Sequence, residues 1–113
     1  MNDLEQRLQM IEFRQELLFQ NDGFSRLVYE YDLTREQRDK FYDLMELYSK
    51  RITDGEKVSH HSFEQEVYEI TPQNDNNYHF VEFITKELFE AGRWEIVFKA
   101  LYGKTPKYKN LFE

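Results

Sequence analysis

TREQRDKFYDLMELYSKRITDG, residues 34–55, carries the strongest helix signals of this chain. Thr34 is a preferred N-cap residue, and Gln37 stands three positions later, as in a capping box. The apolar side chains that follow recur at helical spacing, and they are Phe41, Leu44, Met45, Tyr48 and Ile52. Basic residues end the run and Gly55 follows it, as is usual at a helix C-terminus. The stretch predicts an amphipathic helix that is closed at both ends.

Glycines divide the rest of the chain. All four, at positions 23, 55, 92 and 103, come directly after a segment with helical apolar spacing. Glycine is favoured at the left-handed position that ends a helix, because it has no Cβ to clash there. The resulting helices lie near 2–20, 24–31, 34–52, 59 or 62 to 70, 78–88 and 94–101, and the polar stretch 72–77 is expected to be an exposed turn or hinge. No run alternates with period two, so we predict an all-α, compact array of five or six short-to-medium helices.

The first predicted helix, 2–20, has two rows of apolar residues. One row is Leu4, Leu8, Ile11 and Leu18, with Gln15 at its single polar point, and the adjacent row is Met10, Phe13 and Leu17. A stripe this broad can face two neighbours, one inside the subunit and one in another chain. A polar residue within an apolar seam can specify alignment and oligomeric state.

Length and charge set the broad class. The 113 residues fit one domain, which we place at 1–103 and follow by a basic tail at 104–113. The net charge is −7, and residues 1–103 alone carry 12 basic and 21 acidic side chains. This balance disfavours a general nucleic-acid partner, which would need a basic face. For the tail, with Lys104, Lys107 and Lys109, we expect a solvated extension in preference to a charged contact arm.

The expected cellular compartment is inferred from three features that the sequence lacks. It contains no cysteine, no apolar run long enough to span a membrane, and no leader of the secretory type. We therefore expect a cytoplasmic protein with no membrane partner.

Metal and catalytic chemistry find little support. His60, His61 and Glu64, with the distant His79, have ligand side chains, but they lack the spacings of known zinc sites, and exposed histidines at a helix start are the simpler interpretation. The remaining carboxylates at helical spacing are Glu66, Glu69, Glu82, Glu87 and Glu90. No nucleophilic triad and no phosphate-binding loop is present, so we name no catalytic, cofactor-binding or metal residue and expect no cofactor and no enzyme activity.

Aromatic residues make up 17% of the chain, which is more ring area than a small core easily hides. Tyr29, Tyr31, Tyr42 and Tyr48 alternate with charges, and aromatic residues are enriched at protein interfaces. We therefore predict a homo-oligomer, with a twofold dimer as the default and a trimer around the first helix as the alternative. Another protein could also cover these faces.

Two stretches, YDLTREQRDKFYDLMELY at 31–48 and ELFEAGRW at 87–94, resemble the YhaI-like family of small Bacillus proteins. The resemblance extends over the full length and implies a cytoplasmic all-helical protein, with no catalytic residues to transfer. Together these observations predict a self-associating protein-interaction or regulatory module without catalytic activity. The alternatives are a small metal-binding protein or enzyme that uses His60 and His61, and a DNA-binding regulator, which the acidic charge disfavours.

Overall fold

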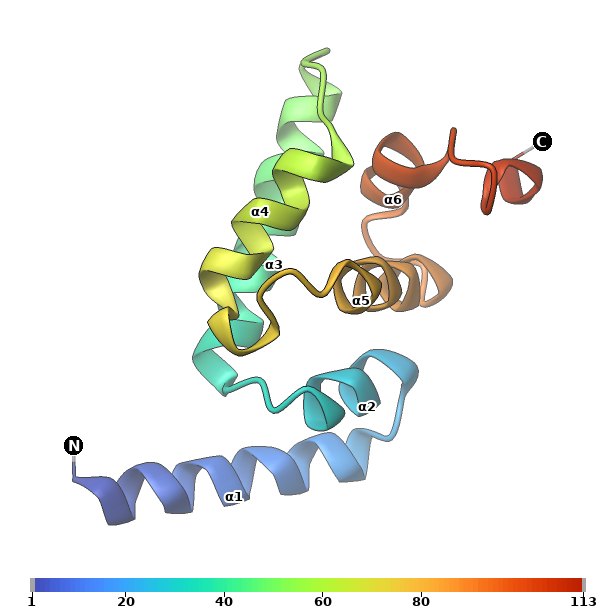
Figure 1. The fold of residues 1–113 in the computed structure, drawn as a ribbon. Coiled ribbons are helices and arrows are strands. Elements are labelled where there is room, and N and C mark those ends of the chain that lie inside the picture. Colours follow the sequence, from blue (N-terminus) through green and yellow to red (C-terminus); the bar gives the residue numbers. More distant parts are fainter. Residues whose placement is uncertain (1, 113) are drawn as a thin grey trace.

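The computed structural model describes residues 2–112 and is helical throughout (Figure 1). Its elements are α1 (Asp3–Gln20), α2 (Gly23–Glu30), α3 (Arg35–Thr53), α4 (His60–Ile70), the 3-10 turn η1 (Pro72–Asn74), α5 (Tyr78–Glu90), α6 (Glu95–Tyr102) and the 3-10 turn η2 (Lys109–Phe112). No strand occurs within residues 2–112. The predicted all-α class is therefore confirmed, with six α-helices in the described part of the chain. None of these helices is long and apolar enough to cross a membrane.

The long helix α3 starts with the capping box that the sequence predicts. The Thr34 hydroxyl accepts a hydrogen bond from the Gln37 backbone N–H at 3.1 Å, and the Gln37 side chain accepts one from the Thr34 N–H at 3.0 Å. Two backbone donors that the helix cannot pair internally are thereby satisfied. The cap fixes where α3 begins. Helices α4 and α6 pack against α3.

Three of the four glycines follow a helix end as predicted, and one of them, Gly103 after α6, has a φ of −64° and so lies outside the left-handed region. Gly55 and Gly92 have φ values of +83° and +75°, in the left-handed region, after α3 and α5. The prediction is wrong for Gly23, which is the first residue of α2, where a Cβ would clash with the Glu87 carboxylate. Asn21 instead ends α1 with a φ of 47°. Asparagine tolerates this conformation better than other side chains do, so it can replace glycine there.

A single hydrophobic core joins the helices. α1 packs on α2, α2 on α5, and α5 on α6. Figure 1 shows α1 (blue) along one edge of the molecule, with the other helices on one side of it. The largest fully buried side chains come from all six helices and one connection, and they are Phe13, Leu17, Val28, Leu33, Phe41, Met45, Tyr48, Phe63, Phe80, Ile84, Leu88 and Phe98.

The polar stretch 72–77 is a turn with four of its six residues exposed, as expected, but side-chain hydrogen bonds fasten it to the domain. Asn74 is buried, and its amide donates to the Tyr31 carbonyl at 3.4 Å. The side-chain amides of Gln73 and Gln37 pair with each other at 2.7 and 3.0 Å. A polar segment can be taken into a fold when partners of this kind satisfy its donors and acceptors.

The basic segment after Gly103 also packs on the domain, so the solvated extension expected for it is wrong over residues 104–112. Tyr108 is buried, with its ring 5.1 Å from that of Phe98, and the Phe112 ring lies 5.4 Å from that of Phe89. Lys107 forms an ion pair with Glu82 at 3.2 Å. These contacts anchor the segment to α5 and α6.

The core absorbs most of the aromatic side chains. Tyr48 is buried, and Tyr29, Tyr31 and Tyr42 are half-buried and pack against the core. Within residues 2–112, the exposed aromatic side chains are Phe19, Tyr78 and Phe83. The four tyrosines singled out in the sequence therefore do not form an exposed surface.

Candidate functional site

The outward face of α1 is the main exposed apolar surface of the described chain. Leu4, Leu8, Ile11 and Leu18 are 65, 50, 53 and 59% exposed. With Gln15 they follow alternating four- and three-residue steps, so at about 100° per residue they occupy an arc of roughly 80°. We call these five residues the α1 seam. Five of the ten exposed large hydrophobic side chains of residues 2–112 lie on α1, four of them in the seam.

The opposite face of α1 is the one that holds the helix to its own subunit. Phe13 and Leu17 are almost completely buried, and Met10 is partly buried against the core. The guanidinium groups of Arg35 and Arg38 lie 4.9 and 5.0 Å from the centre of the Phe13 ring. The two apolar rows predicted for this helix are thus separated, one packed inside the chain and the other open to solvent.

Charged residues border the seam along both edges. Helical spacing puts Arg7 and Arg14 on one edge and Glu5 and Glu12 on the other. Arg14 is engaged within the subunit, because it pairs with Asp32 at 2.8 Å and lies over the Tyr29 ring at 4.0 Å. Arg7 pairs only with its helical neighbour Asp3, at 3.2 Å, through side chains that are 75 and 77% exposed. Such a pair contributes little and is easily exchanged.

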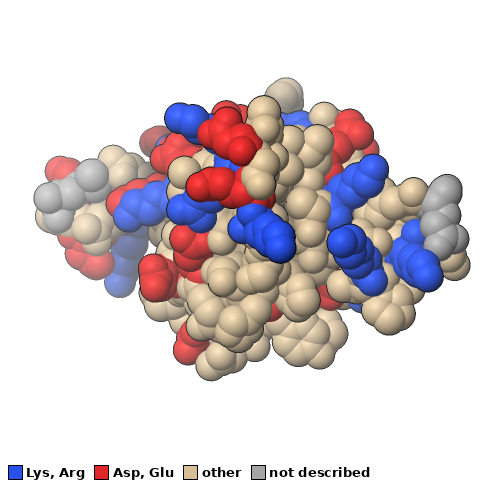
Figure 2. Space-filling model, turned by 90° about the horizontal axis from the view of Figure 1, so that it is seen from above, with Lys and Arg blue, Asp and Glu red and all other residues tan. Residues whose placement is uncertain are grey.

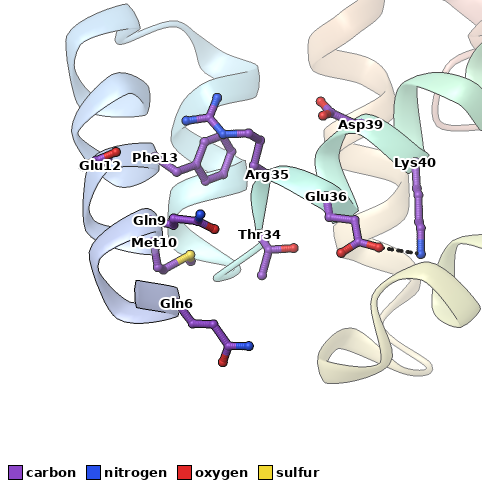
Figure 3. Close-up of a pocket in the computed structure, with 10 residues that line it drawn as sticks. All are labelled: Gln6, Gln9, Met10, Glu12, Phe13, Thr34, Arg35, Glu36, Asp39 and Lys40. Carbon is purple, nitrogen blue, oxygen red and sulfur yellow. Dashed lines mark ion pairs between the residues drawn. The ribbon is translucent and has the colours of Figure 1, made fainter. Parts of the chain in front are cut away.

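A groove lies between α1 and the start of α3 (Figure 3). Met10 and Phe13 supply its apolar wall, and Arg35 projects over Phe13 from the other side (Figure 3). The Arg35 side chain pairs with Glu16 at 2.8 Å, which also holds the pKa of Glu16 below its usual range, and Lys40 pairs with Glu36 at 3.1 Å. Asp39 pairs with Arg38 at 3.0 Å, so among the charged side chains that line the groove only Glu12 has no ion pair within residues 2–112, and the groove does not present a convergent charge to a ligand.

A buried polar cluster joins α4 and α6. The Tyr102 hydroxyl donates to the buried Glu64 carboxylate at 3.1 Å. Burial, reinforced by Glu64, raises the pKa of Tyr102 above its usual range. Burial also raises the pKa of Tyr108, and the Glu82 carboxylate adds to that effect. Both phenols stay neutral within the folded domain. Their carboxylate neighbours, Glu64 and Glu82, interact with side chains of the same chain and do not form a site for a ligand.

The histidines considered as metal ligands do not converge. His60, His61 and His79 are exposed, and the rings of His60 and His79 lie against Tyr102 and Tyr78 at 5.7 and 4.1 Å. Glu64, which shares a helical face with His60, is turned towards Tyr102. Over residues 2–112 no group of three or more His, Asp or Glu side chains could hold a metal ion.

The other helical carboxylates considered in the sequence are dispersed. Glu66 accepts a hydrogen bond from the Tyr48 hydroxyl, and Glu90 pairs with Lys86 at 3.5 Å. Burial, together with that hydrogen bond to Glu66, raises the pKa of Tyr48. Glu87 lies near Gly23, and Glu69 is exposed. These contacts are of the kind found throughout an acidic helical surface.

Charge is mixed on the face drawn in Figure 2, where lysine and arginine side chains lie among aspartate and glutamate over much of the charged area. In the C-terminal segment, Lys107 is already paired with Glu82. A continuous basic surface, as duplex binding requires, is not seen on this face.

Comparison with models of protein families, with curated proteins and with solved structures finds no match for this chain. The resemblance to the YhaI-like family therefore stays a prediction from the sequence. Of the surfaces considered, the α1 seam is the one that sequence reasoning placed correctly on a single helical row. The sequence did not show which of the two rows faces outward.

Proposed function

We propose that this protein is a self-associating helical module of the cytoplasm, acting in protein interaction or regulation and without catalytic activity. The single observation that carries the proposal is the α1 seam, in which four large aliphatic side chains are at least half exposed along one side of a helix. Covering such side chains is favourable in proportion to the apolar area removed from water, and a homo-oligomer buries the same area in every copy.

The pattern of the seam favours another helix as its partner. Apolar residues at alternating four- and three-residue steps form the narrow row along which two helices pack in a coiled coil. The seam spans little more than two heptads, so we expect association that depends on protein concentration and reverses on dilution. Reversible assembly of this kind suits a regulatory module better than a permanent scaffold.

Two other functions, metal binding or catalysis at His60 and His61 and DNA binding, are less well supported by the arrangement of side chains. A metal-binding protein or enzyme based on His60 and His61 would need further ligands or a base close to them, and Glu64 is engaged with Tyr102 instead. A DNA-binding regulator would need basic side chains against phosphates, whereas the chain carries a net charge of −7.

Light scattering coupled to size exclusion tests the proposal over a range of protein concentrations. Self-association predicts a molar mass that rises from the 14.0 kDa of one chain towards a multiple of it as concentration increases. A mass that stays at one chain up to millimolar concentration would contradict the proposal.

A further inference from the structure

We infer that two copies of this chain meet along the α1 seam with their helices parallel and in register. In that arrangement Arg7 of each copy faces Glu12 of the second copy. The inference rests on the proposed self-association and adds the direction and alignment of the contact, which are carried by the charged edges of the seam and by Gln15.

The charged edges distinguish the two possible directions. In a parallel pair, the arginine edge of one helix runs beside the glutamate edge of the other, because the twofold axis lies along the helices. In an antiparallel pair equal edges meet, so arginine would face arginine and glutamate would face glutamate. Arg7 and Glu12 are five positions apart, which is the offset at which residues on these two edges approach one another in a parallel coiled coil.

Both members of this ionic contact are accessible. Arg7 is held only by the exposed pair with Asp3, and Glu12 is exposed on the same helix. Arg14, the other arginine of that edge, is occupied by Asp32 and Tyr29. The Arg7–Glu12 contact therefore supplies the charge complementarity of the interface, and it occurs twice because of the symmetry.

The position of Gln15 also favours a parallel pair of helices. In a parallel, aligned pair its amide lies opposite the same amide of the second copy, and each can donate to and accept from the other. In an antiparallel pair it would lie opposite a leucine or isoleucine of the seam, and a buried amide without a partner is costly. A polar layer of this kind fixes the alignment of coiled-coil helices.

The rest of the subunit leaves room for this contact. Phe13 and Leu17 anchor α1 through its opposite face, so the two domains would lie on the outer sides of the helix pair. Phe19, which is 92% exposed near the C-terminal end of α1, borders the seam and would gain cover from the second copy.

Disulfide cross-linking reports the direction cleanly because the chain has no cysteine of its own. The variants are Leu4→Cys and Leu18→Cys, at seam positions that lie about 21 Å apart along the helix. A disulfide requires Cα atoms within about 7 Å. Gln6→Cys, at an exposed position off the seam, is the matched control.

A parallel, aligned pair predicts that Leu4→Cys and Leu18→Cys each cross-link with themselves under mild oxidation, and that Gln6→Cys does not. Cross-linking found only when the Leu4→Cys and Leu18→Cys variants are mixed would overturn the inference but leave the self-association intact. An oligomer that forms no cross-link at either position would also overturn it. A chain that stays monomeric by light scattering would refute the proposed function itself.

Charge exchange provides an independent test. Arg7→Glu alone should weaken association by roughly tenfold, and Arg7→Glu combined with Glu12→Arg should restore it, with both effects reduced at high salt. An antiparallel contact predicts the opposite sign for Arg7→Glu, since the change would relieve repulsion between arginines. Tighter association of that single variant would overturn the inference.

Discussion

Replacing Ile11 with aspartate separates the stability of the subunit from the stability of its assembly. Ile11 is 53% exposed on the outward face of α1, so the single subunit has little packing to lose. Substitutions at such positions usually change the free energy of unfolding by about 0.5 kcal/mol or less. We therefore expect Ile11→Asp to keep the helical content and the unfolding transition of the isolated subunit.

In the assembly the same change is severe. Each of two copies would place a carboxylate in the middle of an apolar contact, where an unpaired charge costs several kcal/mol unless it stays hydrated. Every 1.4 kcal/mol weakens association by about tenfold. A loss of at least about 3 kcal/mol over the two copies therefore predicts association weaker by roughly a hundredfold or more.

The assay combines light scattering over a concentration series with urea unfolding at low concentration. Leu17→Ala is the matched control, because Leu17 lies on the inward face of the same helix and is 2% exposed. It should lower the free energy of unfolding by about 2–5 kcal/mol. If Ile11→Asp destabilises the subunit as much as Leu17→Ala does, or leaves association unchanged, then Ile11 does not lie in an interface between copies.

Further predictions concern the fold itself. Thr34→Ala removes the cap of α3 and should lower the free energy of unfolding by about 1 kcal/mol in urea titrations, and an unchanged value would mean that the cap contributes nothing. Truncation after Gly103 removes the packed rings of residues 104–112 and should cost about 2–4 kcal/mol in the same assay, whereas a solvated extension would cost none. The raised pKa values of Tyr102 and Tyr108 make stability fall at alkaline pH. The pKa of Tyr48 is raised as well, so above about pH 10 the unfolded chain loses three protons that the folded domain retains, and unfolding should become easier by roughly 4 kcal/mol per pH unit. Urea titrations from pH 9 to 12 check this, and a free energy of unfolding that stays constant over that range would contradict it.

Local chemistry made several features of the fold predictable from sequence. The start of α3 depends on two side chains three positions apart, Thr34 and Gln37, which need no distant partner. The left-handed ends at Gly55 and Gly92 follow equally local rules. The end of α1 was predicted at the right residue, but Asn21 takes the left-handed conformation there, and Gly23 begins α2 instead of ending α1.

Features that depend on distant partners were not predictable in this way. Asn74 looks like part of an exposed turn until the carbonyl of Tyr31 is placed beside it. Tyr108 sits among lysines in the sequence, and only the position of Phe98 on α6 shows that its ring is buried. The aromatic content likewise suggested a surface, whereas the rings pack mainly with one another inside the domain.

For the candidate site, sequence alone supplied the row but not its orientation. Both rows of α1 are apolar, so periodicity could not tell which one meets the core. The inward row contains Phe13, whose large ring fits beneath two arginines of α3, and this packing leaves the aliphatic row outside. The regular spacing of the outer row and its one polar position, Gln15, were visible in the sequence, but they did not reveal its orientation.

Isotope-filtered NMR can observe directly whether copies of this chain meet along the α1 seam. A sample that mixes labelled and unlabelled chains at high concentration shows contacts between methyl groups of different copies only. Contact along the α1 seam predicts such signals for the methyl groups of Leu8 and Ile11, and none for those of Leu17. Contacts between copies that involve other surfaces but not the seam, or none at all, would contradict it.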